Sequence, residues 1–310
     1  MEKLVIIGSG PAGLTAGLYA GRALLSPLIL EGKEPGGQLM GTSFVENWPG
    51  EISILGPTLM KNMRNQALHC GARIVSEELV KADLSVRPFV LTTSTQTLVK
   101  THALIIATGA SFKRLNCKGE SDYWGKGVST CAVCDGPLYR DKPVVIVGGG
   151  DSAMENASFL SNFTTNITIV HLLPQLTASP SMQQRVLSNP RIHIIYESTV
   201  TELEGDGKRV THAVITNQKT GEKTLLRADG VFISIGLSPN TGLFREYLET
   251  DPFGYLTLKN GTETSVRGVF AAGDAVDNRY RQAITSAGTG CSASLDAERY
   301  LHGPLFKKSD

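Results

Sequence analysis

Short runs of apolar residues alternate with glycine turns along this chain, and each run has the length of one buried strand. The first run is residues 3–8, and a second of the same kind is residues 143–148. Each is followed by a glycine turn, a helix-length stretch and another apolar run. These are residues 14–25 and 27–31 in the first copy, and residues 154–163 and 166–171 in the second. The pattern predicts two βαβ units, each with a buried parallel sheet.

Four further segments are expected to be strands. Residues 90–98 have a β pattern, residues 102–109 and 230–236 are buried runs that end at a glycine turn, and residues 268–274 end in Gly-Asp. Because the βαβ unit occurs twice, the pattern predicts two nucleotide-binding domains. The domain changes are expected near residues 112 and 241, where turns follow strands.

Composition narrows the class of protein. The chain has 310 residues, of which 41% are hydrophobic and 19% charged, as in an ordinary globular protein of about two domains. Its net charge of +1 favours binding to neither nucleic acid nor an anionic membrane. No apolar run reaches the roughly 18 residues that span a bilayer. The first segment runs straight into a glycine motif, so it is expected to be a strand and not a signal peptide, and a cytoplasmic location follows.

The first glycine turn carries a dinucleotide-binding pattern. Gly8, Gly10 and Gly13 have the G-x-G-x-x-G spacing, in which the first glycine permits a tight turn, the second admits a pyrophosphate and the third lets helix and strand pack. The helix N-terminus would face the phosphates. Glu31 ends the next strand, where a carboxylate can accept hydrogen bonds from a ribose. The alternative is a glycine turn that serves packing alone.

The sharpest chemical feature is Cys131-Ala-Val-Cys134-Asp135. Two intervening residues bring both sulfurs within disulfide reach on one helical turn. A helix N-terminus there would lower the pKa of a thiol, which favours exchange. Asp135 is placed to move the proton that a leaving sulfur needs. We therefore interpret Cys131, Cys134 and Asp135 as catalytic.

Two other interpretations of the cysteine pair are a zinc knuckle and an ordinary buried pair. Zinc needs four ligands, usually a second C-x-x-C or paired histidines. Cys70, Cys117 and Cys291 stand alone and the six histidines are scattered, so we predict no metal site. Each lone cysteine is expected to be a small buried hydrophobe.

With these residues in place, the chain resembles the low-molecular-weight thioredoxin reductases over essentially its whole length. The segments that carry the resemblance are Gly8-Ser9-Gly10-Pro11-Ala12-Gly13, Gly36-Gly37-Gln38-Leu39, residues 46–50, Ala107-Thr108-Gly109, Cys131 to Asp135, residues 148–153, Gly273-Asp274 and residues 280–290.

The resemblance implies an α/β fold of two Rossmann-like three-layer nucleotide-binding domains, the second inserted into the first. Residues 1–112 and 241–310 would form an FAD-binding domain, and residues 113–240 a pyridine-nucleotide-type domain that carries the redox pair. The resemblance also implies a homodimer and a thioredoxin-like substrate. Flavin electrons would reduce the disulfide, with Cys134 facing the flavin, Cys131 attacking the substrate and Asp135 acting as general acid.

The matched segments also supply candidate FAD contacts. Glycines allow close backbone approach, the amides of Gln38 and Asn47 can hydrogen-bond to ring or ribose, and Asp274 can bind the ribityl chain. Arg281, Gln282 and Ala283 are expected to begin a helix whose N-terminus stabilises a reduced flavin, although this stretch could also be a dimer or packing surface. The full set is Gly8, Gly10, Pro11, Ala12, Gly13, Glu31, Gly32, Gly36, Gly37, Gln38, Leu39, Asn47, Thr108, Gly109, Gly273, Asp274, Arg281, Gln282 and Ala283.

One segment departs from the family. NADPH-using members carry His-Arg-Arg-x-x-x-Arg followed by a small-residue pair, whereas residues 171–179 here begin with His171 and end with Ala-Ser but have Leu172, Leu173 and Thr177 at the three arginine positions. Because arginine binds a phosphate with two charge-assisted hydrogen bonds, their loss predicts weak NADPH binding. The acid that would hold the ribose of NADH is also missing.

The electron donor is therefore left open by the residues. Since related flavoproteins with a degraded motif accept electrons from reduced ferredoxin, we favour ferredoxin, with NADH, residual NADPH use and a dithiol oxidase that passes electrons to oxygen as alternatives. The second glycine turn, residues 148–150, is interpreted as a structural relic, with weak nucleotide binding as the alternative. Two other interpretations of the whole chain are a flavin-binding redox sensor or interaction module and a pyridine-nucleotide oxidoreductase of another substrate. The intact Cys131 and Cys134 argue against both, and Asp135 argues against a sensor.

Overall fold

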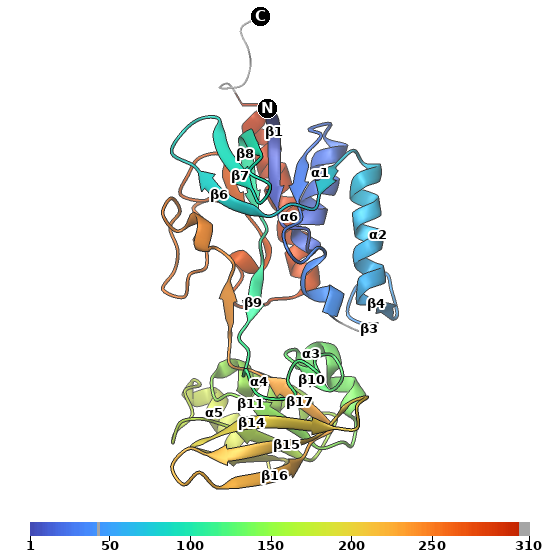
Figure 1. Ribbon diagram of the computed structural model, residues 1–310, viewed down its shortest axis with the longest axis vertical. Helices are drawn as coiled ribbons and strands as arrows, with labels where there is room; N and C mark the ends of the chain where they lie inside the picture. Colours follow the sequence, from blue (N-terminus) through green and yellow to red (C-terminus); the bar gives the residue numbers. More distant parts are fainter. Residues whose placement is uncertain (42–43, 304–310) are drawn as a thin grey trace, which may run out of the picture. The chain divides into compact units, whose positions relative to one another are not determined.

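The computed structural model describes residues 1–41 and 44–303, and the chain divides into two compact units (Figure 1). Unit 1 comprises Met1–Ser111 and Ser238–Asp310, and unit 2 comprises Phe112–Leu237. Each unit has its own mainly parallel sheet covered by helices, so the predicted α/β class with two Rossmann-like units is confirmed.

Unit 1 is built on a seven-stranded sheet whose central strand is β8 (Leu98–Ile106). On one side β8 pairs with parallel β1 (Glu2–Ile7). On its other side, its C-terminal half pairs with parallel β19 (Val269–Ala271) and its N-terminal half with antiparallel β7 (Phe89–Thr93). The sheet thereby joins both chain segments of unit 1. The remaining strands of the sheet are β2 (Leu28–Leu30), between β1 and β5, and the two edge strands β5 (Arg73–Val75) and β6 (Leu79–Asp83). A separate pair is β3 (Phe44–Val45) with β4 (Ile54–Leu55).

Both faces of this sheet are buried around β1, which explains why its last four residues, Leu4 to Ile7, are all apolar. Leu4 and Ile6 pack with residues of the helices, whereas Val5 and Ile7 pack against β6, β7 and the region of Phe244. Alternate side chains of a strand point to opposite faces, so a strand covered on both sides has no polar positions. The helices of unit 1 are α1 (Pro11–Arg22), α2 (Gly56–His69) and α6 (Ala283–Leu301).

Helix α6 packs closely on α1 at Gly290. A Cβ added there would lie 2.1 Å from the backbone oxygen of Ala12. We expect Gly290→Ala to lower the free energy of unfolding by about 1–3 kcal/mol through overpacking, despite the ~0.5–1 kcal/mol that alanine gains in helix propensity. Gly288 in the same helix is the matched control, because a Cβ there meets no atom within 4 Å. Denaturant unfolding of both variants measures the difference, and equal effects would contradict this packing.

Unit 2 repeats the layered design on a five-stranded parallel sheet in the order β10-β17-β11-β12-β13. In β11 (Val144–Val147), Val144 and Ile146 pack under the helices, while Val145 and Val147 pack against an antiparallel sheet. The other strands of the parallel sheet are β10 (Val128–Ser129), β12 (Ile167–Val170), β13 (Ile192–Ile195) and β17 (Gly230–Ile233). The helices are α3 (Ala132–Asp135), α4 (Asp151–Leu160) and α5 (Pro180–Leu187). The antiparallel sheet is β14 (Ser198–Gly205), β15 (Val210–Asn217) and β16 (Lys223–Arg227).

The two connections between the units pair with each other as β9 (Ala110–Phe112) and β18 (Leu237–Pro239). Asn240, just after β18, ties the two chain segments together. Its side-chain amide donates to the Thr108 oxygen at 3.0 Å and accepts from the Ser111 hydroxyl at 2.9 Å, and its backbone N–H donates to the Gly109 oxygen at 2.9 Å. Asn240 was not predicted from the sequence to have this role.

Helices begin earlier than the sequence pattern suggested. Helix α1 begins at Pro11 and α4 at Asp151, directly after the glycines that act as their N-caps, Gly10 and Gly150. Proline suits the first helical position because its missing N–H would have no partner there. None of the helices in the described residues is both long and apolar enough to cross a bilayer.

Candidate active site

The three glycines of the first turn differ in the space around them. A Cβ on Gly8 would lie 2.2 Å from the Ala107 oxygen, and one on Gly13 would lie 1.9 Å from the Gly8 oxygen, so these two glycines permit close backbone packing. A Cβ on Gly10 would meet no atom within 4 Å. Gly10 therefore faces open space at the N-terminus of α1, where a phosphate can approach the backbone.

Glu31 lies directly after β2 with a side chain that is almost completely buried. Its Oε1 accepts a hydrogen bond from Arg64 Nε at 3.1 Å, and its Oε2 accepts one from the Ser76 hydroxyl at 2.8 Å. Each carboxylate oxygen can accept two hydrogen bonds, so these contacts fix the carboxylate and leave acceptor capacity for a ribose. Arg64 and Ser76 were not identified from the sequence.

The other candidate FAD segments gather around the same turn. The Gly36 N–H donates to the Ser9 hydroxyl at 3.0 Å, and a Cβ on Gly273 would lie 2.9 Å from Ala12 Cβ. Thr108 and Gly109 follow Ala107, which packs against Gly8. Segments far apart in the sequence, residues 8–13, 36–39, 107–109 and 273–274, therefore meet at one end of the unit 1 sheet.

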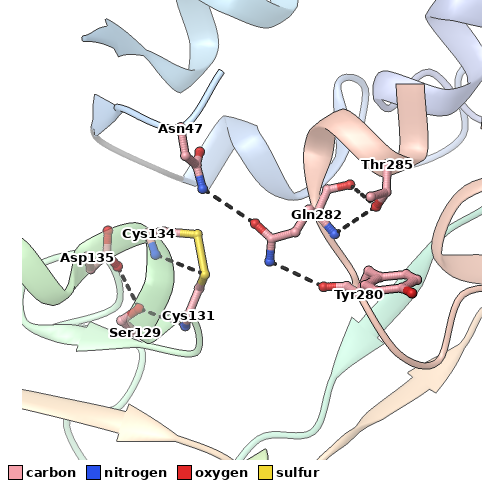
Figure 2. The surroundings of a disulfide bond; sticks show 8 residues. All are labelled: Asn47, Ser129, Cys131, Cys134, Asp135, Tyr280, Gln282 and Thr285. Carbon is pink, nitrogen blue, oxygen red and sulfur yellow. Dashed lines mark hydrogen bonds between the residues drawn. A yellow bond between two sulfur atoms is a disulfide. The ribbon is translucent and has the colours of Figure 1, made fainter. Parts of the chain in front are cut away.

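The amide side chains of this region are held by hydrogen bonds within unit 1. Gln38 Nε2 donates to the Ala110 oxygen at 2.6 Å, and Asn47 Nδ2 donates to Gln282 Oε1 at 3.4 Å (Figure 2). Gln282 is the N-cap of α6, so this helix begins at Ala283 and not at Arg281 as the sequence suggested. Arg281 has a φ of 52°, a left-handed conformation that excludes it from the helix.

Asp274 follows β19 and accepts a hydrogen bond from the Ser286 hydroxyl of α6 at 3.0 Å. Burial raises the pKa of Asp274 to about 6, and the hydrogen bond from Ser286 opposes this shift. A neutral or ionised carboxyl at this place can accept hydrogen bonds from hydroxyl groups.

Unit 1 has the features expected around a large polar ligand. Among the described residues, Thr108 Oγ1 and Arg281 Nε are buried polar atoms without a hydrogen-bond partner. Such atoms are rare in folded proteins unless a ligand or water satisfies them. A Cβ on Gly10 or on Gly109 would meet no atom within 4 Å, so there is open space beside both glycines. This space and the two buried polar atoms fit a dinucleotide such as FAD.

In unit 2, Cys131 and Cys134 form a disulfide with a Cα–Cα distance of 5.3 Å. Cys131 is the N-cap of α3, and its Sγ accepts a hydrogen bond from the backbone N–H of Cys134 at 3.2 Å. A donor aimed at this sulfur also stabilises a thiolate once the disulfide opens. Val133, between the two cysteines, is exposed.

Asp135 is the last residue of α3 and is partly buried. Burial raises the pKa of its carboxyl, and a hydrogen bond from the Ser129 hydroxyl to Oδ2 at 2.6 Å opposes this shift. A raised pKa favours the protonated acid that can supply a proton to a leaving sulfur. Figure 2 shows the hydrogen bond between Ser129 and Asp135. Ser129 was not identified from the sequence.

The second glycine turn keeps its packing role. A Cβ on Gly148 would lie 2.3 Å from the Ser234 oxygen, and one on Gly149 would lie 2.3 Å from the ring of His171. The nearest atom to a Cβ on Gly150 would be Thr177 Oγ1, at 3.7 Å. The buried His171 ring, with Nε2 3.0 Å from the Gln175 oxygen, thus packs onto this turn.

Leu172, Leu173 and Thr177, at the three positions that carry arginine in the family motif, are exposed and uncharged. Leu172 and Leu173 are 55% and 45% exposed. The carboxylate of Asp151, at the start of α4, accepts hydrogen bonds from the backbone N–H and the hydroxyl of Ser179 at 2.7 and 2.9 Å. Residues 172–175 and 177 are exposed, and none of them carries a charge. Among the described residues, no three His, Cys, Asp or Glu side chains gather to hold a metal ion.

Comparison with known proteins decides the family. The model of the pyridine nucleotide-disulphide oxidoreductase family matches residues 2–290. A thioredoxin reductase of Dictyostelium discoideum is 47% identical over 312 residues, which cover 97% of this chain and 98% of that protein. The chain belongs to the low-molecular-weight thioredoxin reductase family. The structure of a thioredoxin reductase from Giardia duodenalis matches with a TM-score of 0.92 and 45% identity over 97% of this chain and 99% of that one. One from Streptococcus pyogenes matches with a TM-score of 0.90 and 38% identity over 96% and 97%.

Membership of the thioredoxin reductase family makes this chain a flavoprotein disulfide oxidoreductase, as the resemblance implied. The family binds FAD, and the residues of unit 1 described above fit that cofactor.

Proposed function

We propose that this enzyme reduces the disulfide of a thioredoxin-type protein through Cys131 and Cys134, and that its electron donor is not NADPH. The observation that carries the first part is the disulfide at the start of α3, next to a partly buried carboxyl, Asp135, whose pKa is raised. A cysteine pair that served only stability would need no adjacent acid. The homodimer and the cytoplasmic location expected from the sequence belong to the same proposal.

Unit 1 would hold FAD, with the pyrophosphate at Gly10, a ribose at Glu31 and the ribityl chain at Asp274. Thr108 Oγ1 and Arg281 Nε, the two buried polar atoms without a partner among the described residues of unit 1, are further candidate contacts. Bound FAD would supply the two electrons that open the Cys131–Cys134 disulfide. Unit 2, in this proposal, is the pyridine-nucleotide-type domain that carries the redox pair.

The cysteines would divide the exchange reaction between them. After reduction, the Cys131 thiolate attacks the disulfide of the substrate, and a mixed disulfide forms while one substrate sulfur leaves as a thiolate. Cys134 then attacks Cys131, which releases the second substrate sulfur and restores the Cys131–Cys134 disulfide. The Cys134 N–H that donates to Cys131 Sγ supports the attacking thiolate. Asp135 supplies and recovers the proton of the leaving sulfur.

Leu172, Leu173 and Thr177 are the residues that make us expect weak NADPH binding. A 2′-phosphate carries nearly two negative charges, and each charge-assisted hydrogen bond that arginine would make to it contributes about 1.5–3 kcal/mol. The loss of two or three such bonds weakens NADPH binding at least about 100-fold. NADH would also bind weakly, because His171 stands where an acid would hold its ribose. The donor we favour is reduced ferredoxin. Ferredoxin donates one electron at a time, so two molecules would be needed to reduce one disulfide.

Anaerobic mixing of the oxidised protein with reduced ferredoxin, NADH or NADPH tests the donor. We expect reduced ferredoxin to bleach the flavin absorbance rapidly and NADPH to do so slowly, at millimolar concentration. Rapid bleaching by micromolar NADPH would refute the donor argument. If only reduced thioredoxin bleaches the flavin and air restores its colour, the protein is a dithiol oxidase that passes electrons to oxygen.

A further inference from the structure

Ser129 connects three parts of the disulfide site. It is the last residue of β10, and only 9% of its surface is exposed. Its hydroxyl donates to Asp135 Oδ2 at 2.6 Å and accepts a hydrogen bond from the backbone N–H of Cys131 at 3.1 Å (Figure 2). Cys131 in turn accepts from the Cys134 N–H at 3.2 Å. One side chain thereby links the acid to the cysteine pair.

The two hydrogen bonds of Ser129 fix the direction of its own proton. A hydroxyl has one proton and two acceptor lone pairs. Because the N–H of Cys131 occupies a lone pair, the proton of Ser129 is directed at Asp135, and the carboxyl is held from one side. Helix α3 has only four residues, so few backbone hydrogen bonds are available to fix the side chain at its end.

We propose that Ser129 is a positioning residue for the disulfide reaction, because its hydroxyl holds the Asp135 carboxyl in the orientation that delivers a proton to the leaving cysteine sulfur. The proposal rests on the role given to Asp135 above and adds a residue that none of the sequence motifs contained. It predicts that Ser129 acts through Asp135 and has little effect of its own.

Reduction of the enzyme disulfide by dithiothreitol isolates this step, since it needs no electrons from the flavin. A dithiothreitol thiolate attacks one sulfur of the Cys131–Cys134 pair, the S–S bond breaks, and the leaving sulfur takes the proton of Asp135. The second dithiothreitol thiol then closes to the cyclic disulfide, so that two cysteine thiols form as one dithiol is oxidised. Quenching the holoenzyme with an alkylating reagent and counting thiols gives the rate constant per dithiothreitol thiolate.

We expect Asp135→Asn to lower this rate constant on the order of 100-fold, as for loss of a general acid, and Ser129→Ala to lower it about tenfold. In the Asp135→Asn background, Ser129→Ala should lower the rate constant by less than about twofold, since the effects of two residues that act as one unit do not add. The matched control is Ser158→Ala in α4, because the Ser158 hydroxyl is buried without a partner among the described residues and has no hydrogen bond to Asp135. It should keep the wild-type rate.

The pH profile separates positioning from a merely structural role. The Ser129 hydrogen bond lowers the pKa of Asp135, so its removal raises that pKa further. An acid donates only below its pKa, and the alkaline fall of the rate constant should therefore move to higher pH in Ser129→Ala. Ser129→Thr keeps the hydroxyl and should leave this limb where it is in the wild type.

Three results would overturn the positioning role. These are an undiminished effect of Ser129→Ala in the Asp135→Asn background, an alkaline limb that does not move, or a limb that moves equally in Ser129→Thr. If Ser129→Ala fails to bind flavin or to unfold cooperatively, the Ser129→Thr profile alone decides. A proposed function that failed would be recognised separately, because Asp135→Asn and replacement of the cysteines would then leave thioredoxin reduction unchanged.

Discussion

Cys134→Ser is expected to abolish thioredoxin reduction, with a fall in kcat of at least about 10³-fold, because no disulfide can form to carry electrons onward. The flavin itself should still bleach with an artificial donor, since the residues proposed to bind it lie in unit 1. Measurement of thioredoxin reduction and of flavin bleaching in the same preparation therefore separates the two half-reactions.

Cys117→Ser is the matched control for this experiment. Cys117 lies in unit 2, makes no disulfide, and burial together with Glu120 raises the pKa of its thiol to about 11, so it carries almost no thiolate at neutral pH. We expect turnover within about twofold of the wild type. Full turnover of Cys134→Ser with any donor would show that electrons bypass the cysteine pair.

The second large effect is a gain of NADPH use. The triple substitution Leu172→Arg, Leu173→Arg and Thr177→Arg should lower the NADPH concentration for half-maximal flavin bleaching at least about 100-fold, because arginine restores charge-assisted bonds to the 2′-phosphate. NADH, which lacks that phosphate, should change by less than about threefold. Anaerobic titration of flavin absorbance with each nucleotide gives both values.

The control for added charge is Leu225→Arg in β16. Leu225 is 57% exposed, close to the 55% of Leu172, and lies in the antiparallel sheet away from residues 171–179 in the sequence. It should leave NADPH use unchanged. If the triple variant gains nothing over this control, the missing arginines are not the reason for weak NADPH use, and the second glycine turn itself no longer admits a dinucleotide.

The parts of the fold that were predicted are those with a local pattern. Runs such as residues 3–8 and 143–148 are apolar because both sheet faces are covered, and this requirement is visible in the residues themselves. Helix α2 and the strands β14 to β16 were not predicted. Most residues of β16 are exposed, so apolar and polar residues do not alternate clearly along it. Such a strand has no strong local pattern from which it could be predicted.

The site was predicted where a motif fixes a residue type, and missed where the partner is distant or ordinary. Glycine spacing separated Gly10 from Gly8 and Gly13, and the structure gives the physical difference between them. Arg64 and Ser76 reach Glu31 from 33 and 45 residues away, which no local pattern reveals. Ser129 is near the cysteines in sequence, but only its hydrogen bonds distinguish it from any buried serine.

The adjacency of β9 and β18 has a consequence for how this enzyme could change its donor. The chain enters unit 2 through β9 and leaves it through β18, and these two strands pair, so the two ends of unit 2 are adjacent. On the unit 1 side of this pair, Asn240 donates a hydrogen bond to the Thr108 oxygen. The insert can accumulate substitutions in residues 171–179 without altering a single strand of the sheet that carries the first glycine turn. If FAD is held by unit 1 and the donor is selected at residues 171–179, as proposed, a substitution that changes the donor leaves the FAD-binding residues unchanged.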